Sequence, residues 1–342
     1  MKPNIPSELT HGKFRISPVL GFERGPSVFR FEPSGIIKIG DTYHVYYTRF
    51  SPSIGWFELF NTPNHLQIWM ATSKDGWHWN EVGQVLQDSP AGSWHQDGKH
   101  APHVIRVNGA FYMFYTAHLG PDYVNKRIGL AVADNPAGPF RHIGLGPLLN
   151  AGTDSGVFDS LGQDDSCVLQ REDEFWWYFK GYGINPETRR PINNRLCLAI
   201  SDSIEGPYVR CADNPVTWSH TGCLWPHGNG VAMLSDVVDI SGNQTYPPCI
   251  QYSRDGIHFV RGAEIQATAA DADIEDAMAL SVKHWGVKII DAGVYSPKNS
   301  YPEETEGGMS FGLCQLPDGV NAPDATHPER SPFIVRFDYD LY

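Results

Sequence analysis

Ionisable side chains recur just before apolar, strand-like runs at five well-separated places in this 342-residue chain. Carboxyl and imidazole groups transfer protons, and two carboxyls held close together shift each other's pKa, so that one keeps a proton while the other stays ionised. Cleavage of a glycosidic bond needs both states, because one group protonates the leaving oxygen and another activates water. The residues are Glu32, Asp97, His100, Asp164, Asp165, His220, Glu275 and Asp276.

These residues can meet only if the chain returns to one place five times, and the sequence contains a repeat of that kind. A run rich in Val, Ile, Tyr, Phe and Trp recurs, as in DTYHVYYTR at 41–49 and GAFYMFYTA at 109–117, and later copies begin at 173, 229 and 284. Each run follows a shorter apolar stretch and a tight turn, a pattern typical of a β-hairpin. In four of the five copies another strand and a turn with Asp or Gly follow.

Four strands per repeat are typical of a propeller blade. We therefore predict an all-β fold in which residues 1–342 form a single five-bladed β-propeller domain with four antiparallel strands per blade. The runs 13–20 and 332–342 are also strand-like, and we expect these N- and C-terminal strands to close the ring, which would remove open sheet edges. Innermost strands begin near the axis, so the ionisable residues should line one polar funnel. The alternative is that they are ordinary turn residues.

Composition argues against several other classes of protein. The 39 acidic residues outnumber the 26 basic ones, and no Lys or Arg run is present, so we expect no nucleic-acid partner. No stretch approaches the roughly 18 to 20 apolar residues of a membrane helix, so we expect no membrane partner. The start MKPNIP lacks an apolar signal core, and the expected location is the cytoplasm, or the periplasm if a leader was removed.

No metal or other cofactor is expected. The six cysteines lack Cys-x-x-Cys spacing and are expected to be buried free thiols. Histidines recur near the predicted funnel, but they lack the short paired spacing of a zinc motif, and we expect them to act as structural groups or substrate donors. They are His100, His103, His220 and His227.

Several stretches together resemble glycoside hydrolase family 117. They are FDSLGQDDSCVL at 158–169, YFKGYG at 178–183, LAISDSIEGPYV at 198–209, NPVTWSHTGCLWPHGNGVAML at 214–234 and IQYSRDGIHF at 250–259. The resemblance runs through about residues 25 to 265 and implies a five-bladed propeller related to family 43. It also implies an exo-acting hydrolase that releases terminal α-linked 3,6-anhydro-L-galactose or a related sugar from agar-type oligosaccharides. An oligosaccharide is thus the expected partner.

The resemblance further implies an inverting mechanism with three named roles. Glu32 stands at the position of the base, where the family usually has Asp; Asp165 stands at the position of the residue that tunes pKa values; His220 stands at that of the general acid. Two neighbours depart from the family, because Ser166 replaces a usual Pro and Thr221 replaces a common Glu. Glu for Asp extends the base by about 1.5 Å. Without the neighbouring Glu, the expected pKa of the histidine is lower.

Two alternatives stay open at this point. An enzyme similar to family 43 arabinofuranosidases or xylosidases would use a Glu as the acid, and Glu275 is the candidate. A non-catalytic propeller that binds carbohydrate would also have substituted residues at family positions. Additional substrate-binding candidates, each with packing or solvent exposure as the alternative, are Asp97, His100, Lys180, Trp225 and Glu275.

The sequence also bears on chain-end specificity and on assembly. The insert SPSIGWFELFNTPNH at 51–65 carries aromatic residues that would narrow the site to chain ends, unless the loop simply folds onto its blade. Members of family 117 are often dimers swapped through an N-terminal helical segment. The residues before the first predicted blade read as extended, so we do not expect a helix-swapped dimer, and the oligomeric state is not predicted.

Overall fold

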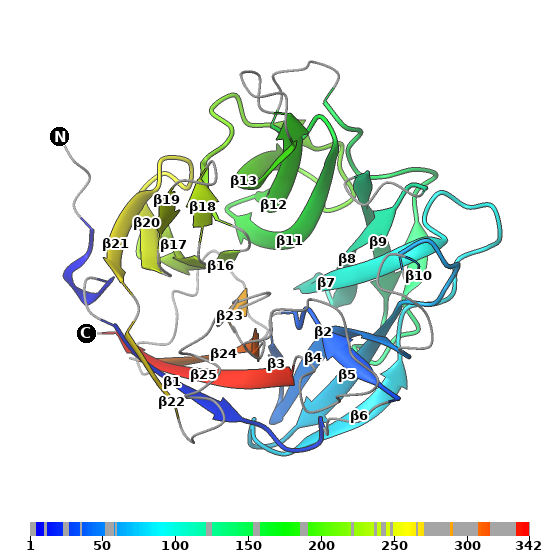
Figure 1. Ribbon diagram of the computed structural model, residues 1–342, viewed down its shortest axis with the longest axis horizontal. Coiled ribbons are helices and arrows are strands. Elements are labelled where there is room, and N and C mark those ends of the chain that lie inside the picture. The colour runs from blue at the N-terminus through cyan, green and yellow to red at the C-terminus, as the bar shows by residue number, and fades with distance from the viewer. Residues whose placement is uncertain are drawn as a thin grey trace.

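The chain forms an all-β propeller in the computed structural model, with its sheets arranged around a central axis (Figure 1). Neighbouring sheets contact one another around this axis, from the first sheet to the fourth. The residues that the structure describes are 5–9, 12–22, 27–34, 36–51, 58, 60–120, 125–152, 158–184, 191–219, 222–235, 238–240, 244–246, 249–264, 266–269, 288–289, 307–314 and 333–341.

Four sheets are antiparallel meanders that follow chain order from the axis outward. We call them blades one to four. Blade one contains β2 (Phe29–Phe31), β3 (Ile37–Ile39), β4 (Thr42–Phe50), β5 (Gln67–Ser73) and β6 (Trp79–Gln84). Blade two contains β7 (Asp97–Val107), β8 (Ala110–His118), β9 (Lys126–Ala133) and β10 (Arg141–Ile143).

Blades three and four continue the same pattern. Blade three contains β11 (Gly162–Arg171), β12 (Glu174–Ile184), β13 (Pro191–Ser201), β14 (Val209–Arg210) and β15 (Thr217–Trp218). Blade four contains β16 (Gly222–His227), β17 (Gly230–Ser235), β20 (Cys249–Ser253) and β21 (Val260–Glu264). The predicted strand-like runs that begin at 41, 109, 173 and 229 are therefore confirmed as the second strands of these blades, whereas most of the run that begins at 284 lies outside the described residues.

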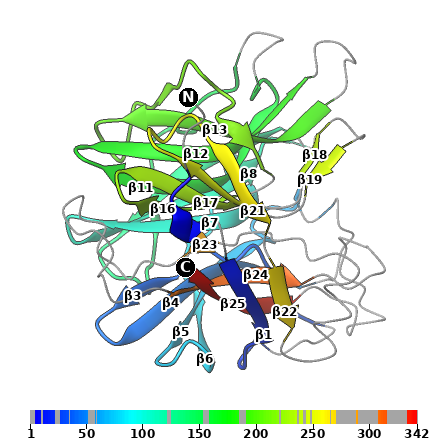
Figure 2. The ribbon, with the colours of Figure 1, turned by 90° about the vertical axis from the view of Figure 1, so that its left-hand side faces the viewer.

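Another sheet joins the two ends of the described chain. β1 (Gly12–Pro18) pairs antiparallel with β25 (Phe333–Leu341) and parallel with β22 (Gln266–Ala269), and the sheet continues through β24 (Gly307–Cys314) to β23 (Lys288–Ile289). This terminal sheet departs from the blade pattern because one of its pairings is parallel. Four blades thus have the predicted form, and the count of five and the closed ring stay predictions. A small sheet of β18 (Val238–Ile240) and β19 (Gln244–Tyr246) lies apart (Figure 2).

Apolar side chains between neighbouring blades form the core. Tyr46 and Phe140 pack edge to face between blades one and two, and both are fully buried. Trp177 occupies the equivalent space between blades two and three, whereas its neighbour Trp176 is only half-buried. This difference follows from strand geometry, since successive side chains point to opposite faces of a sheet. It confirms that at least one of the two tryptophans packs in the core.

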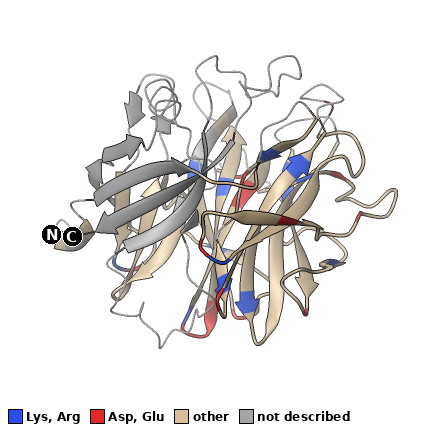
Figure 3. Cartoon of the chain, turned by 90° about the horizontal axis from the view of Figure 1, so that it is seen from below, with Lys and Arg blue, Asp and Glu red and all other residues tan. Residues whose placement is uncertain are grey.

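The described thiols agree with the expectation of free cysteines. Cys167, Cys197 and Cys249 are buried thiols, and Cys211 is a half-buried thiol. Acidic and basic residues are scattered over the described ribbon (Figure 3). No helix in the described part of the chain is long and apolar enough to cross a membrane.

Candidate active site

The inner strands of blades one, two and three share a backbone distortion near the axis. Glu32, Ala101 and Asp165 all have positive φ angles, of 51°, 48° and 44°. The sheet register shifts between His100 and His103, and between Asp164 and Ser166, so Ala101 and Asp165 lie in β-bulges. Left-handed backbone at a non-glycine residue costs about 1–3 kcal/mol and is found preferentially at functional sites. The shared distortion therefore marks the axis as the candidate site.

Glu32 lies between β2 and β3 and is 8% exposed. Its Oε2 accepts hydrogen bonds from the Ala101 amide at 3.0 Å and from the Thr48 hydroxyl at 3.4 Å. Both donors are neutral. Burial raises the pKa of Glu32 to about 7, with His100 opposing this shift and the two blade-three aspartates adding to it. Glu32 can therefore hold or release a proton near neutral pH.

Asp164 has the opposite environment, although it is only 1% exposed. Lys126 lies 2.7 Å and Lys180 3.2 Å from its Oδ2, while Thr116 donates to Oδ1 at 2.8 Å. Burial alone would raise the pKa of this carboxyl, but the two ammonium groups and the His100 ring hold it well below its usual range. Asp164 is consequently a fixed negative charge and cannot serve as a proton carrier.

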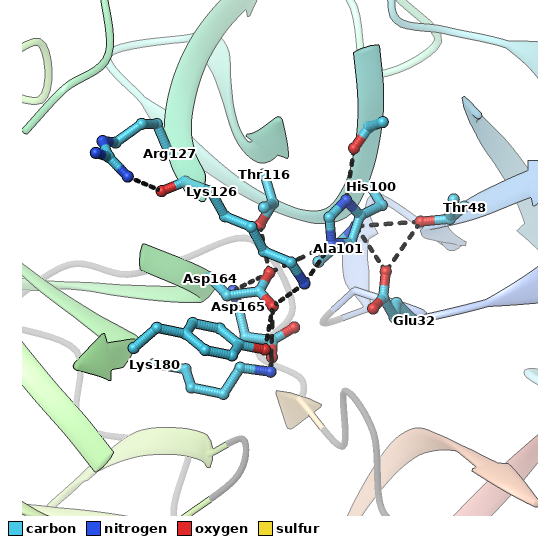
Figure 4. A network of polar contacts seen from close by, with 12 residues as sticks. Glu32, Thr48, His100, Ala101, Thr116, Lys126, Arg127, Asp164, Asp165 and Lys180 are labelled. Atoms are coloured by element: carbon cyan, nitrogen blue, oxygen red, sulfur yellow. Dashed lines mark hydrogen bonds and ion pairs between the residues drawn. The ribbon is translucent and has the colours of Figure 1, made fainter. Parts of the chain in front are cut away.

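Asp165 follows in the bulge and faces a different partner. Its Oδ2 lies 2.5 Å from Nζ of Lys180, and its own amide donates to Oδ1 of Asp164 at 3.0 Å. Lys180 is 3% exposed, and its two aspartate partners raise its pKa well above the usual value despite burial. Because Lys180 contacts both carboxyl groups, it holds them side by side. Figure 4 shows Glu32 on the other side of His100 from this pair.

His100 lies between the two carboxylate environments and is fully buried. Its Nδ1 lies 2.6 Å from the Gly98 carbonyl oxygen, which accepts a hydrogen bond, so Nδ1 carries a proton. Its Nε2 then faces Asp164 at 3.4 Å and Lys126 at 3.5 Å. Phe60, from the loop between β4 and β5, packs edge to face on the ring with centroids 5.3 Å apart. This loop therefore contacts blade two as well as belonging to blade one, and the narrowing of the site to chain ends by the 51–65 insert stays a prediction.

The structure brings together five of the residues singled out from sequence, namely Glu32, His100, Asp164, Asp165 and Lys180. Asp97 begins β7, is partly exposed, and takes part in none of the described contacts of this network. Trp225 lies in β16 and is 5% exposed, which agrees with the alternative that this side chain packs in the core. His220 and Glu275 lie outside the described residues. The roles assigned to all of these residues stay predictions.

Sequence reasoning missed Lys126 and the central place of Asp164 in the network. Asp164 was noted beside Asp165, but the bulge makes it the buried centre of the network. Lys126, 1% exposed, was not considered. The available signal was its place at the start of the apolar run KRIGLAVA, where a lysine needs a buried partner if it points inward. Among described residues, no three His, Cys, Asp or Glu side chains are arranged to hold a metal ion.

Comparison with known proteins shows that this chain is similar to glycoside hydrolases. Residues 27–181 match the model of glycosyl hydrolases family 43. This match covers β2 to β12 and contains Glu32, His100, Lys126, Asp164 and Asp165.

Two curated relatives are similar to part of this chain. The chain is 26% identical over 218 residues to an extracellular endo-α-(1→5)-L-arabinanase of Thermotoga petrophila, covering 52% of this chain and 42% of that one. It is 27% identical over 124 residues to an extracellular endo-α-(1→5)-L-arabinanase of Bacillus subtilis, covering 30% of this chain and 26% of that one. The chain thus spans less than half the length of the curated relatives it matches.

The structural likeness extends over nearly the whole chain. A family 117 glycoside hydrolase from the marine bacterium Zobellia galactanivorans superposes with a TM-score of 0.75 at 23% identity, covering 98% of this chain and 92% of that one. The expected resemblance to a family 117 fold related to family 43 is therefore confirmed. Together, the family match, the relatives and the fold support a glycosidase.

Proposed function

We propose that this chain is an exo-acting, inverting glycoside hydrolase that releases a terminal α-linked 3,6-anhydro-L-galactose or a related sugar from agar-type oligosaccharides. The observation that carries the proposal is the pair of buried carboxyl residues, Glu32 and Asp165, at equivalent left-handed positions of two inner strands. Five blades around one axis would complete the funnel in which they lie. The family 117 fold likeness favours the anhydro-sugar over other glycosides.

In the proposed reaction Glu32 is the base. A water oxygen attacks the anomeric carbon and its proton passes to the Glu32 carboxylate, while His220 protonates the departing glycosidic oxygen. Since burial raises the pKa of Glu32 to about 7, kcat/KM should rise with pH through that value as the carboxylate forms. Asp165, paired with Lys180, orients the sugar and tunes the neighbouring groups.

Glu32→Gln tests the base directly. The variant keeps size and hydrogen-bonding capacity but cannot take a proton, so kcat should fall by about 10² to 10⁴. Glu172→Gln is the matched control, because Glu172 also has a left-handed backbone, with φ of 54°, yet is exposed in the turn between β11 and β12. Activity of Glu32→Gln within tenfold of the wild type would overturn the assignment.

A second candidate function is an α-L-arabinan-directed hydrolase. The family 43 match and the two relatives named as arabinanases favour it. Release of reducing sugar should be compared on agar-, porphyran-, carrageenan- and arabinan-derived oligosaccharides. Turnover restricted to the arabinan set would replace the anhydro-sugar proposal, and binding of an oligosaccharide without any turnover would indicate a carbohydrate-binding propeller.

The identity of the acid separates the two enzymatic candidates. His220→Asn should abolish turnover if the histidine protonates the leaving group, whereas Glu275→Gln should do so in an arabinofuranosidase-like enzyme. Activated aryl glycosides, whose leaving groups need no proton, should restore turnover in whichever variant lacks the true acid. A variant that stays inactive on such substrates would show that the residue has another role.

A further inference from the structure

Lys126 occupies an unusual place for a lysine. It begins β9, the third strand of blade two, yet its side chain reaches inward to the axis and is 1% exposed. Its Nζ lies 2.7 Å from Oδ2 of Asp164 in blade three and 3.5 Å from Nε2 of His100 in β7. A buried ammonium group needs a compensating anion, and Lys126 therefore fastens blade two to blade three at the level of the candidate site (Figure 4).

The charges around Lys126 determine what it can do there. Asp164 and Asp165 face two lysines, Lys126 and Lys180, so this part of the network is balanced. If Lys126 were neutral, Lys180 would be the remaining ammonium in described contact with both aspartates. The position of Lys180 between them would then shift, and the carboxylate of Asp165 would lose its fixed partner.

Lys126 also acts on Glu32 without touching it. His100 separates the two, and both His100 and Lys126 lower the pKa of Glu32, whereas Asp164 and Asp165 raise it. Lys126 itself is faced by Asp164 and His100, and it lies 5.3 Å from the ring centre of Tyr182. His118 of β8 also lies within its field, because Lys126 lowers the pKa of that imidazole.

We propose that Lys126 is a positioning residue for the reaction at Glu32 and Asp165: its ammonium group fixes Asp164 and the His100 ring, and leaves Lys180 to hold Asp165. This inference rests on the proposed glycoside hydrolase function. This positioning role differs from a purely structural one. The positive charge of Lys126 favours the ionised form of Glu32, whereas a neutral side chain of similar size at position 126 would not.

The test compares Lys126→Met and Lys126→Gln with the wild type in pH profiles of kcat/KM. The loss of the charge should move the rising limb of the kcat/KM profile, which is assigned to Glu32, to higher pH by about one unit. At a fixed pH below that limb, kcat/KM should therefore fall about tenfold. Lys126→Arg, which keeps the charge, should restore the limb toward its original pH. Lys74→Met is the matched control, since Lys74 pairs with Asp41 on the surface, and it should leave the profile unchanged.

A merely structural lysine would give a different result. Partial misfolding lowers the fraction of active protein at every pH but leaves the limb in place. An unshifted limb in Lys126→Met and Lys126→Gln, or loss of folding in both, would overturn the proposal. Lys126→Gln is included because its amide can still donate to Asp164, which preserves one buried contact.

A second measurement separates this inference from the proposed function. Infrared difference spectra of wild type against Glu32→Gln report the protonated carboxyl of Glu32 without any substrate, and the same subtraction in the Lys126→Gln background should place its midpoint about one pH unit higher. If no glycoside is hydrolysed but this midpoint shifts, the proposed function fails while the electrostatic link stands. If glycosides are hydrolysed and the midpoint does not shift, the inference about Lys126 fails alone.

Discussion

The inner strands of blades one and three bend in the same way and place carboxyl groups in opposite electrical surroundings. Glu32 and Asp165 have nearly equal φ angles, of 51° and 44°. The described hydrogen-bond donors to Glu32 are a hydroxyl and a backbone amide, and its pKa is raised to about 7. Beside Asp165, Asp164 is surrounded by two ammonium groups, and its pKa is held well below the usual range.

This difference shows that the backbone determines where a side chain of the site points, whereas the neighbouring residues determine its protonation state. The bulge aims a side chain toward the axis, whatever its type. The neighbouring side chains then decide whether the group carries a proton. Blade two makes the same point, because its equivalent residue, Ala101, has the bent backbone but no ionisable group, and contributes only its amide to Glu32.

The largest expected effect comes from neutralising the centre of the blade-three network. Asp164→Asn would leave the two buried ammonium groups of Lys126 and Lys180 with a single carboxylate between them. The free energy of unfolding should fall by about 3–5 kcal/mol, as is usual when one member of a buried ion pair is removed. Urea denaturation at pH 7 measures the change.

Asp173→Asn is the control for that experiment, because Asp173 is exposed in the turn between β11 and β12. It should change the free energy of unfolding by less than about 0.5 kcal/mol. A loss below about 1 kcal/mol in Asp164→Asn would mean that the two blades do not differ in the way proposed.

The second prediction concerns the pH dependence of stability at Glu32. Its pKa is raised from 4.5 to about 7 in the folded chain, so the folded state binds the proton more tightly. The stability contributed by this group is present in full below pH 4.5 and is lost as pH rises through about 7. Its full size is about 3 kcal/mol. The difference in unfolding free energy between wild type and Glu32→Gln, measured from pH 4 to 8, isolates it.

The direction of this difference is as informative as its size. Glu32→Gln should become more stable relative to wild type as pH rises, whereas Glu172→Gln should show no such trend. A wild type that gains stability relative to Glu32→Gln over this interval would show that Glu32 is stabilised as an anion, and the contrast between the blades would disappear.

The third prediction concerns the neutral hydrogen-bond donors to Glu32. Thr48→Val removes the hydroxyl that donates to Oε2 while keeping the shape of the side chain. The free energy of unfolding should fall by about 1 kcal/mol, and by more at pH 8 than at pH 5, because the lost donor favours the ionised form. Thr42→Val in the same strand is the control, since its hydroxyl bonds to Asp41 and Lys74 at the surface. An equal loss at both pH values would contradict the account.

The smallest effect is expected from Tyr182→Phe. The Tyr182 hydroxyl donates to Oδ2 of Asp164 at 3.3 Å, alongside the two closer ammonium groups. Because this carboxylate has other donors, the variant should lose less than about 1 kcal/mol of unfolding free energy. A loss above about 2 kcal/mol, measured in urea, would show that Asp164 depends on the phenol and that the lysines contribute less than their distances indicate.

The sequence predicted the blades well because their signals are local. Runs such as GAFYMFYTA and the run that begins at 173 form strands that are buried along most of their length, and the turn Asn108-Gly109, where both residues have positive φ, directly precedes the first of them. Glu32, His100, Asp165 and Lys180 were likewise found from their places beside these strands. Blade repeats thus carry enough local information to locate the axis.

The balance of charge at the axis could not be read from the sequence, because it depends on bulges and on contacts between blades. One extra residue in β11 decides that Asp164 faces the lysines and that Asp165 follows in the bulge. The ammonium group of Lys126 lies 38 residues away from Asp164 in the chain, and meets it only when blades two and three pack together. From the sequence alone, a lysine at the start of a strand is expected to lie in solvent.

The pairing of β1 with β25 bears on how the protein is made. Gly12 lies opposite Leu341, so β1 can form this antiparallel pairing only after the distant strand β25 has been synthesised. Until then, β1 has an unpaired edge that another strand can join. Assembly of the terminal sheet should therefore be a slow stage of folding, and chains that lack β25 should aggregate sooner than chains that contain it.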